Sequence, residues 1–137
     1  MAVRLGYIDA VLGGIASTSQ EFFRPCLRLL EKEGTVFQVG FFAFDDSETT
    51  VFPENVGIFA DVAVNSDMTS DKLSDIAVGA CQIARDIIPK TIFPKITGAV
   101  LSYSTKGSGD GASVDIVREA QQKIPMKLDR IKETNQD

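Results

Sequence analysis

The sequence of 137 residues contains no histidine. This absence excludes mechanisms that use an imidazole as the general base, and it excludes metal sites with histidine ligands. Cysteine is also scarce, since only Cys26 and Cys81 are present. Both fall on the apolar faces of predicted helices, which favours buried thiols over a disulfide framework. We therefore predict no metal site.

Long hydrophobic runs and excess positive charge are missing as well. No stretch approaches the roughly 18 to 20 uncharged apolar residues of a membrane-spanning helix. The formal net charge of −5 and the pI of about 4.7 provide no basic field to attract nucleic acid or an anionic membrane. The first residues are too few and too mixed for a secretory signal. We therefore expect a cytoplasmic protein with no nucleic-acid partner and no membrane partner.

The residues that are present are typical of one globular domain, with 44% apolar and 24% charged side chains. Strands are predicted over 7–14, 35–45, 57–65 and 96–103. Helices are predicted from the region of 17–24 to Gly34, over 69–88 and over about 112–123, and a weak strand or frayed end follows. Strands that alternate with helices indicate an α/β layered domain, in which 35–45 and 57–65 form an irregular hairpin.

The first predicted helix carries two possible N-terminal signals. Ser17 with Gln20, and Thr18 with Glu21, both have the spacing of a capping box. Pro25 complicates the prediction because proline fits only the first turn of a helix. The helix therefore either kinks at Pro25 or begins near Arg24.

Residues 102–111, "SYSTKGSGDG", lie between the fourth predicted strand and the third predicted helix. The unpaired N–H groups and the dipole of a helix N-terminus attract anions, and the turn adds hydroxyls and Lys106. However, its spacing matches neither the P-loop nor the dinucleotide fingerprint, and Asp110 adds a negative charge. The residues alone therefore leave an anion-binding turn and a plain connector both open.

Four segments, read together, resemble one family. They are "GYIDAVLGG", "STSQEFFRP", "FADVAVNSDMTSDKLSDIA" and "AVLSYSTKGSGDG", and the likeness covers about residues 5–120. This combination resembles the phosphate acetyltransferases of the phosphate acetyl/butyryltransferase family. The resemblance implies an α/β, three-layer, two-domain acyltransferase fold like that of isocitrate and isopropylmalate dehydrogenases, here incomplete. Residues 1–30 would end the first domain, and residues 31–137 would form much of the second.

The resemblance implies reversible acetyl transfer between acetyl phosphate and coenzyme A. The expected ligands are coenzyme A, acetyl phosphate and phosphate. Coenzyme A is a substrate, so no cofactor is implied, and we expect a homodimer. The chemistry requires deprotonation of the thiol, donors for the carbonyl oxygen, and arginine or hydroxyl donors for the phosphate leaving group.

The resemblance also assigns roles to particular residues. Arg24, in "FFRP", aligns with an active-site arginine. The hydroxyl-rich turn before it would bind the phosphoryl group, and the glycine-rich turn would face the same cleft. The implied substrate-binding residues are Ser17, Thr18, Ser19, Ser104, Thr105, Lys106 and Ser108.

Two departures from the family pattern limit what the chain is expected to do. Phe22 stands where many members have a threonine, so the phosphate contacts are expected to differ. Nothing in 120–137 matches the family's segment with the catalytic aspartate, a serine and a second arginine. We therefore expect an incomplete piece of the enzyme with very little turnover and exposed apolar surface. A phosphate butyryltransferase-like enzyme and a non-catalytic module that binds coenzyme A or phosphate stay open as alternatives.

Overall fold

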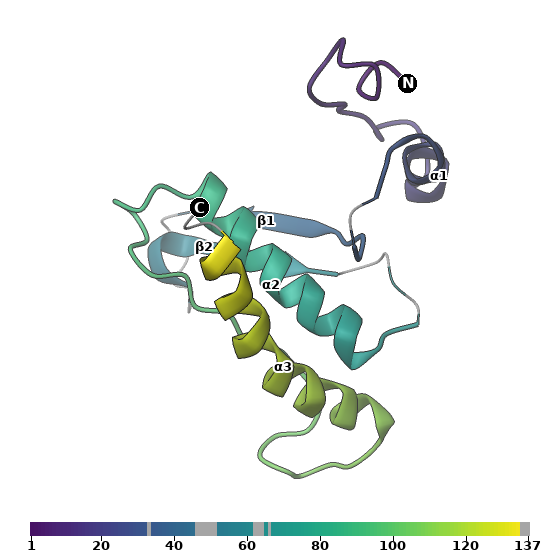
Figure 1. Ribbon diagram of the computed structural model, residues 1–137. Coiled ribbons are helices and arrows are strands. Elements are labelled where there is room, and N and C mark those ends of the chain that lie inside the picture. Colours follow the sequence, from purple (N-terminus) through teal and green to yellow (C-terminus); the bar gives the residue numbers. More distant parts are fainter. Residues whose placement is uncertain (33, 46–51, 62–64, 66, 135–137) are drawn as a thin grey trace. The chain divides into compact units, whose positions relative to one another are not determined.

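The structure is a computed structural model that describes residues 1–32, 34–45, 52–61, 65 and 67–134 (Figure 1). Its elements in chain order are α1 (Ser19–Leu29), β1 (Val39–Ala43), the short 3-10 helix η1 (Pro53–Asn55), β2 (Val56–Ala60), α2 (Ser70–Ile87) and α3 (Ala112–Thr134). The chain divides into two compact units, Met1–Gly34 and Thr35–Asp137, and each is described by itself.

In the first unit α1 is the only regular element among the described residues. The prediction of a strand over 7–14 is wrong, because turns and extended coil occupy this segment. Leu12 and Ile15 in and beside this segment are fully exposed. A strand needs a neighbour that pairs with its backbone, and the described part of this unit contains no other strand.

Helix α1 begins at Ser19 and not near Arg24, and it runs through Pro25. Thr18 is its N-cap, so Thr18 and Glu21 form the capping box and the alternative pair of Ser17 and Gln20 does not. Pro25 has no N–H to donate to the carbonyl of Glu21. Both residues are exposed, so water can satisfy that carbonyl.

The sheet of the second unit is an antiparallel pair, which confirms the predicted hairpin with shorter strands. Its register places Phe42 opposite Gly57 and Gly40 opposite Phe59. The ring centroids of Phe42 and Phe59 lie 5.3 Å apart in an edge-on arrangement. Phe52 adds a third ring, 5.7 Å from that of Phe59. Part of the strand predicted over 57–65 lies outside the described residues.

Helices α2 and α3 lie side by side and supply the core of the second unit (Figure 1). The buried apolar side chains come from α2 and α3 and are Ile76, Val78, Ala84, Val114 and Ala120. Helix α2, predicted from its three- and four-residue periodicity, is confirmed and also contacts β2. The core is small, because all the other large apolar side chains that are described are at least partly exposed.

Two lysines of α3 connect it to α2. The Nζ of Lys127 donates to the carbonyl oxygen of Asp71 at 3.1 Å, to the Oγ of Ser74 at 2.7 Å and to a carboxylate oxygen of Asp75 at 2.5 Å. The Nζ of Lys123 donates to the Oγ of Ser70 at 2.9 Å and to a carboxylate oxygen of Asp71 at 2.8 Å. The buried serines of α2 are therefore satisfied from α3.

Two further predictions differ from the structure. Residues 96–103 form coil and not a strand. Helix α3 does not end near 123 but continues through Pro125 to Thr134. Pro125 and Gln121, whose carbonyl loses its helical donor, are both exposed, while Lys127 fixes the following turn to α2.

The small α/β arrangement is consistent with an incomplete α/β domain, as predicted at this coarse level. The helices of the described residues are all too short or too polar to cross a lipid bilayer.

Candidate functional site

The residues around α1 form two depressions in the first unit. One, of about 380 Å³, lies at the start of the helix and is lined by Gly13, Gly14, Ile15, Ser17, Ser19, Phe22 and Phe23. The other, of about 480 Å³, lies along the helix and is lined by Gln20, Glu21, Arg24, Pro25, Arg28 and Leu29. The structure therefore places Arg24 within α1, Ser19 at the first residue of α1 and Ser17 just before the helix, with Arg24 in a different depression from these two serines.

The first depression has the features of a small anion site. Ser17 and Ser19 line it, and the N–H groups of Ser19 and Gln20 precede the first intrahelical bond, which runs from Phe22 to the carbonyl of Thr18. Such N–H groups and the dipole at a helix start favour negative charge. Gly14 has a φ of 113°, a conformation that glycine adopts without strain.

Phe22 closes one side of this depression. A Cβ atom placed on Gly13 would lie 2.5 Å from the ring of Phe22, so the ring rests directly against the glycine backbone. The ring offers no hydrogen bond donor to a ligand, whereas a threonine hydroxyl at this position would. The expected change in the phosphate contacts stays a prediction. Any anion contacts in this depression come from the neighbouring hydroxyls and N–H groups.

Thr18 has a structural role as the N-cap of α1, and the sequence predicted this role only as one of two possible capping boxes. Its Oγ1 donates to the carboxylate of Glu21 at 2.9 Å and accepts from the N–H of Glu21 at 3.3 Å. The backbone N–H of Thr18 donates to the same carboxylate at 2.9 Å. These bonds, first from the backbone and then from the hydroxyl, lower the pKa of Glu21 below its ordinary value of 4.5. The hydroxyl of Thr18 therefore holds the helix start.

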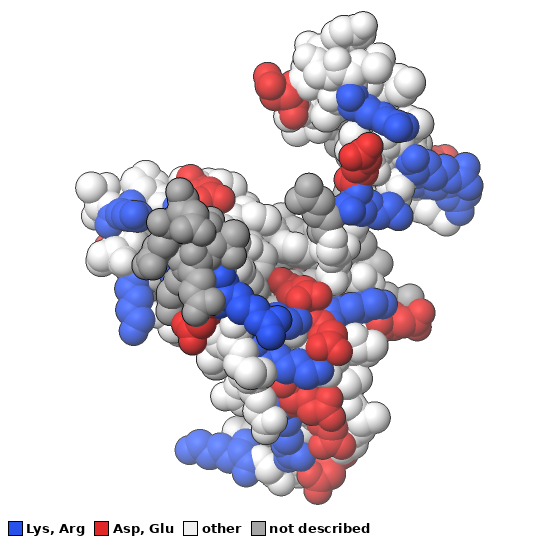
Figure 2. All heavy atoms as spheres, in the orientation of Figure 1, with Lys and Arg blue, Asp and Glu red and all other residues white. Residues whose placement is uncertain are grey.

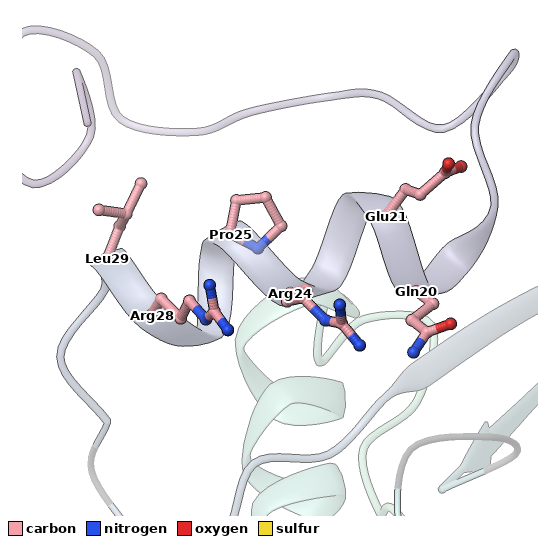
Figure 3. A pocket seen from close by; sticks show the side chains of 6 residues that line it. All are labelled: Gln20, Glu21, Arg24, Pro25, Arg28 and Leu29. Carbon is pink, nitrogen blue, oxygen red and sulfur yellow. The ribbon is translucent and has the colours of Figure 1, made fainter.

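The second depression presents a row of polar side chains. Gln20, Arg24 and Arg28 project from the same side of α1, whereas Glu21, Pro25 and Leu29 project from another (Figure 3). Figure 2 shows basic side chains gathered over α1. In the part of the chain that the structure describes, neither guanidinium lies within ion-pair distance of a carboxylate. Arg24 is therefore free to contact a ligand.

Arg28 was not predicted as a site residue. Its signal is the four-residue step from Arg24 in "RPCLR", which places both side chains on one face of a helix. The proline between them concealed that step, because it suggested that a helix would only begin there. The structure shows one continuous helix from Ser19 to Leu29.

The glycine-rich turn of the second unit is held mainly by its own side chains. The Oγ of Ser104 donates to the carbonyl of Gly109 at 2.8 Å and accepts from its N–H at 3.1 Å. The Oγ of Ser108 accepts from the N–H of Thr105 at 2.9 Å. Lys106 lies at the tip of the turn with a φ of 50° and is exposed. Lys106 and the Thr105 side chain therefore face solvent, whereas Ser104 and Ser108 brace the loop.

The acidic end of this turn is neutralised within the second unit. Arg118 lies 3.4 Å from a carboxylate oxygen of Asp110 and 3.2 Å from one of Asp115. The N–H groups of Val114 and Asp115 donate to the carbonyl of Gly111 at 2.9 and 3.1 Å, which begins α3. The carboxylate of Asp110 is thus paired with Arg118 of α3.

Asp61 and Asn65 have a structural role beside the hairpin. The side-chain amide of Asn65 donates to Asp61 at 2.7 Å and to the carbonyl of Val36 at 3.1 Å. The N–H of Asp61 donates to the carbonyl of Gln38 at 2.8 Å. Together these bonds fix the backbone beside β1. Within the described ranges, no group of three histidine, cysteine or acidic side chains could hold a metal ion.

Comparison with known proteins adds the identity of the family. The phosphate acetyltransferase of Clostridium acetobutylicum is 36% identical over 88% of this chain, and the match covers 35% of that enzyme. The phosphate acetyltransferase of Helicobacter pylori strain J99 is 33% identical over 94% of the chain and 23% of its own length. That of Mycoplasma capricolum is 33% identical over 93% of the chain and 37% of its length. No solved structure matches.

The chain thus spans little more than a third, or less, of these relatives. The sequence model described as "Phosphate acetyl/butaryl transferase" matches residues 1–129, which is almost the whole chain. By this match, and by its identity to these relatives, the protein belongs to the phosphate acetyl/butaryl transferase family.

Proposed function

We propose that this chain is part of an enzyme that transfers an acetyl group reversibly between acetyl phosphate and coenzyme A. Its membership of the family and its relatives named phosphate acetyltransferase support this activity. The observation that carries the proposal is local: Arg24, which has no acidic partner among the residues that the structure describes, lies between one and two turns from a helix start lined by hydroxyls. This arrangement suits a substrate that carries a phosphoryl group.

The start of α1 would hold the phosphoryl end of acetyl phosphate. Ser17 and Ser19 would donate hydroxyl hydrogen bonds, and the first N–H groups of α1 would add backbone donors. Arg24 would neutralise charge on the phosphate as it leaves, since a guanidinium binds phosphate through paired donors. Thr18 acts through the helix, because its hydroxyl and N–H already bind Glu21.

In the second unit, Lys106 and Thr105 at the tip of the glycine-rich turn would contact substrate. The turn is braced by Ser104 and Ser108, so these two predicted residues would position the tip rather than bind the ligand. In this proposal the two units belong to a three-layer, two-domain fold of the dehydrogenase-like type. A cytoplasmic location and a homodimer stay predictions.

These residues by themselves should turn over substrate very slowly. Transfer to coenzyme A requires a base for its thiol. Glu21 is the only carboxylate among the residues lining the two depressions, and its oxygens accept bonds from Thr18. Its lowered pKa also makes it a weak base. This feature favours a second candidate, a non-catalytic module that binds coenzyme A or phosphate. No described feature selects acetyl over butyryl groups.

The test measures the formation of acetyl-CoA from acetyl phosphate and coenzyme A by the purified chain. Arg24→Ala is compared with Arg85→Ala, which removes an exposed arginine of α2. We expect very little turnover, and binding of acetyl phosphate that is weakened by Arg24→Ala alone. Rapid turnover would overturn the proposed need for a further base. Equal binding by both variants would overturn the role of Arg24.

A further inference from the structure

Arg24 and Arg28 form an unusual pair on α1. Like charges four residues apart destabilise a helix, because their side chains meet on one face. In the ranges that the structure describes, no carboxylate lies near enough to offset either charge. The acidic residue next to this row, Glu21, points to another side of the helix and binds Thr18 (Figure 3). The helix dipole favours the charge of Arg28 in the last turn, but the repulsion between the two guanidinium groups would be relieved by an anion bound to both.

The spacing of the pair sets the kind of anion. Four residues of α-helix advance about 6 Å along the axis, so Arg28 lies one turn farther than Arg24 from the helix start. In the proposed function a single phosphoryl group at the helix start engages Arg24, and this group leaves Arg28 without a partner. A ligand that uses both arginines carries a second anionic group beyond the first.

The other residues that line this depression further restrict the kind of ligand that fits it. The two guanidinium groups share it with the amide of Gln20 and with the apolar side chains of Pro25 and Leu29. Its volume of about 480 Å³ exceeds the size of one phosphate and falls in the range of small-molecule sites. It therefore suits an extended ligand with phosphate groups and an apolar part.

We propose that Arg28 is a second substrate-binding residue, which holds the diphosphate group of coenzyme A while Arg24 serves the phosphoryl end of the site. This inference rests on the proposed function, because that function supplies a substrate with a diphosphate. Acetyl phosphate has only one phosphoryl group, so it cannot explain Arg28. Gln20, in the same row, would donate an amide hydrogen bond to the same ligand.

The experiment measures dissociation constants by titration calorimetry for four probes: coenzyme A, dephospho-coenzyme A, pantetheine and inorganic pyrophosphate. The variants are Arg28→Gln and the matched control Arg85→Gln. Each arginine lies in the last turn of its helix and is exposed, so the two changes remove the same charge from equivalent positions. Glutamine keeps the helix propensity close to that of arginine, and circular dichroism confirms that both variants fold.

We expect Arg28→Gln to weaken coenzyme A, dephospho-coenzyme A and pyrophosphate about tenfold or more, which corresponds to one charge-assisted hydrogen bond. Pantetheine, which lacks phosphates, should bind both variants equally, and Arg85→Gln should bind all probes like the unaltered chain. Equal affinities for Arg28→Gln and Arg85→Gln would overturn the inference while leaving the proposed function intact. An effect on coenzyme A but not on dephospho-coenzyme A would also overturn it, because the 3′-phosphate would then be the partner.

Failure of the proposed function gives a different pattern. The unaltered chain would bind pyrophosphate through Arg28 but would bind coenzyme A no better than pantetheine. That outcome would refute coenzyme A as the ligand of this site.

Discussion

Replacement of Lys127 by methionine should destabilise the second unit more than the same replacement of Lys123. Lys127 donates to three acceptors on α2, and one of them, the hydroxyl of Ser74, is fully buried. Its side chain is only 25% exposed. Methionine keeps the length of the apolar stem and the helix propensity, so the change removes mainly the charge and its hydrogen bonds.

The magnitude follows from what each acceptor loses. Hydrogen bonds to charged groups contribute about 1.5 to 3 kcal/mol each when buried. The Asp75 partner is 44% exposed, so solvent screening reduces its share, and we expect a total of about 2 kcal/mol for Lys127→Met. Lys123 bonds to Ser70 and to an Asp71 carboxylate that is 72% exposed, so solvent screens the pair and the loss of Lys123 should cost clearly less than the loss of Lys127.

Thermal unfolding followed by circular dichroism measures the difference. For a domain of about 60–100 residues, 2 kcal/mol lowers Tm by roughly 8 to 16 °C. An NMR titration adds a second readout, because the hydrogen bond from Lys123 is the main cause that lowers the pKa of Asp71. Lys123→Met should return that pKa toward 3.8, the ordinary value. Equal, small Tm shifts for the two variants would show that apolar packing alone joins α2 to α3, contrary to this reasoning.

Three further predictions concern the candidate site. Thr18→Ala should cost about 1 kcal/mol of α1 stability, and because α1 buries no side chain, amide exchange should rise in α1 and not in α2. The pKa of Glu21 is lowered in the fold, so the stabilisation of α1 by the Glu21 carboxylate is complete above the ordinary pKa of 4.5 and is lost as pH falls through the lowered pKa. The helical signal of α1 should therefore decline over that acidic range. Glu21→Gln should abolish this dependence of the helical signal on pH. Ser104→Ala removes both bonds to Gly109 at a cost of about 1 kcal/mol, so exchange of the Gly109 N–H should accelerate while α3 stays protected.

The elements that the sequence predicted well are those with local signals. Helix α2 shows regular apolar spacing and has Thr69 as its N-cap, whose hydroxyl accepts from Lys72. The capping box of α1 needs only Thr18 and Glu21. The hairpin strands follow from runs of β-branched and aromatic residues. Each of these signals depends on residues that are close in the sequence, so a single segment is enough to predict the element.

The predictions that failed depended on partners or on context. Residues 7–14 and 96–103 have the composition of strands, but composition does not supply the neighbouring strand that their backbones need. The third helix was predicted to end near 123, just before Pro125, whereas packing on α2 and the bonds of Lys127 accompany a helix that continues to Thr134. Tertiary contacts overrode the local preference in that case.

Family resemblance assigned Arg24 and the hydroxyl-rich turn to the candidate site. The structure places Arg24 within α1 and the turn at and just before the first residue of α1, and their roles toward a ligand stay predictions. The sequence could not predict which hydroxyls brace the backbone and which face solvent. Thr18 and Ser104 brace it because of the backbone groups that their side chains reach in the fold. Arg28 was missed because Pro25 hid the continuous helix.

The alternation of glycine and phenylalanine in the hairpin has a consequence for how the chain folds. On one face, each phenyl ring stands opposite a glycine of the other strand. A slip by two residues in one direction would set Phe42 against Phe59, and in the other direction it would set Gly40 against Gly57. A slip by one residue would turn the rings of one strand to the opposite face. The alternation of large and small side chains within β1 and β2 thus favours the observed register of the two strands. An isolated two-stranded hairpin is only marginally stable, so the contact of α2 with β2 helps to hold this alignment.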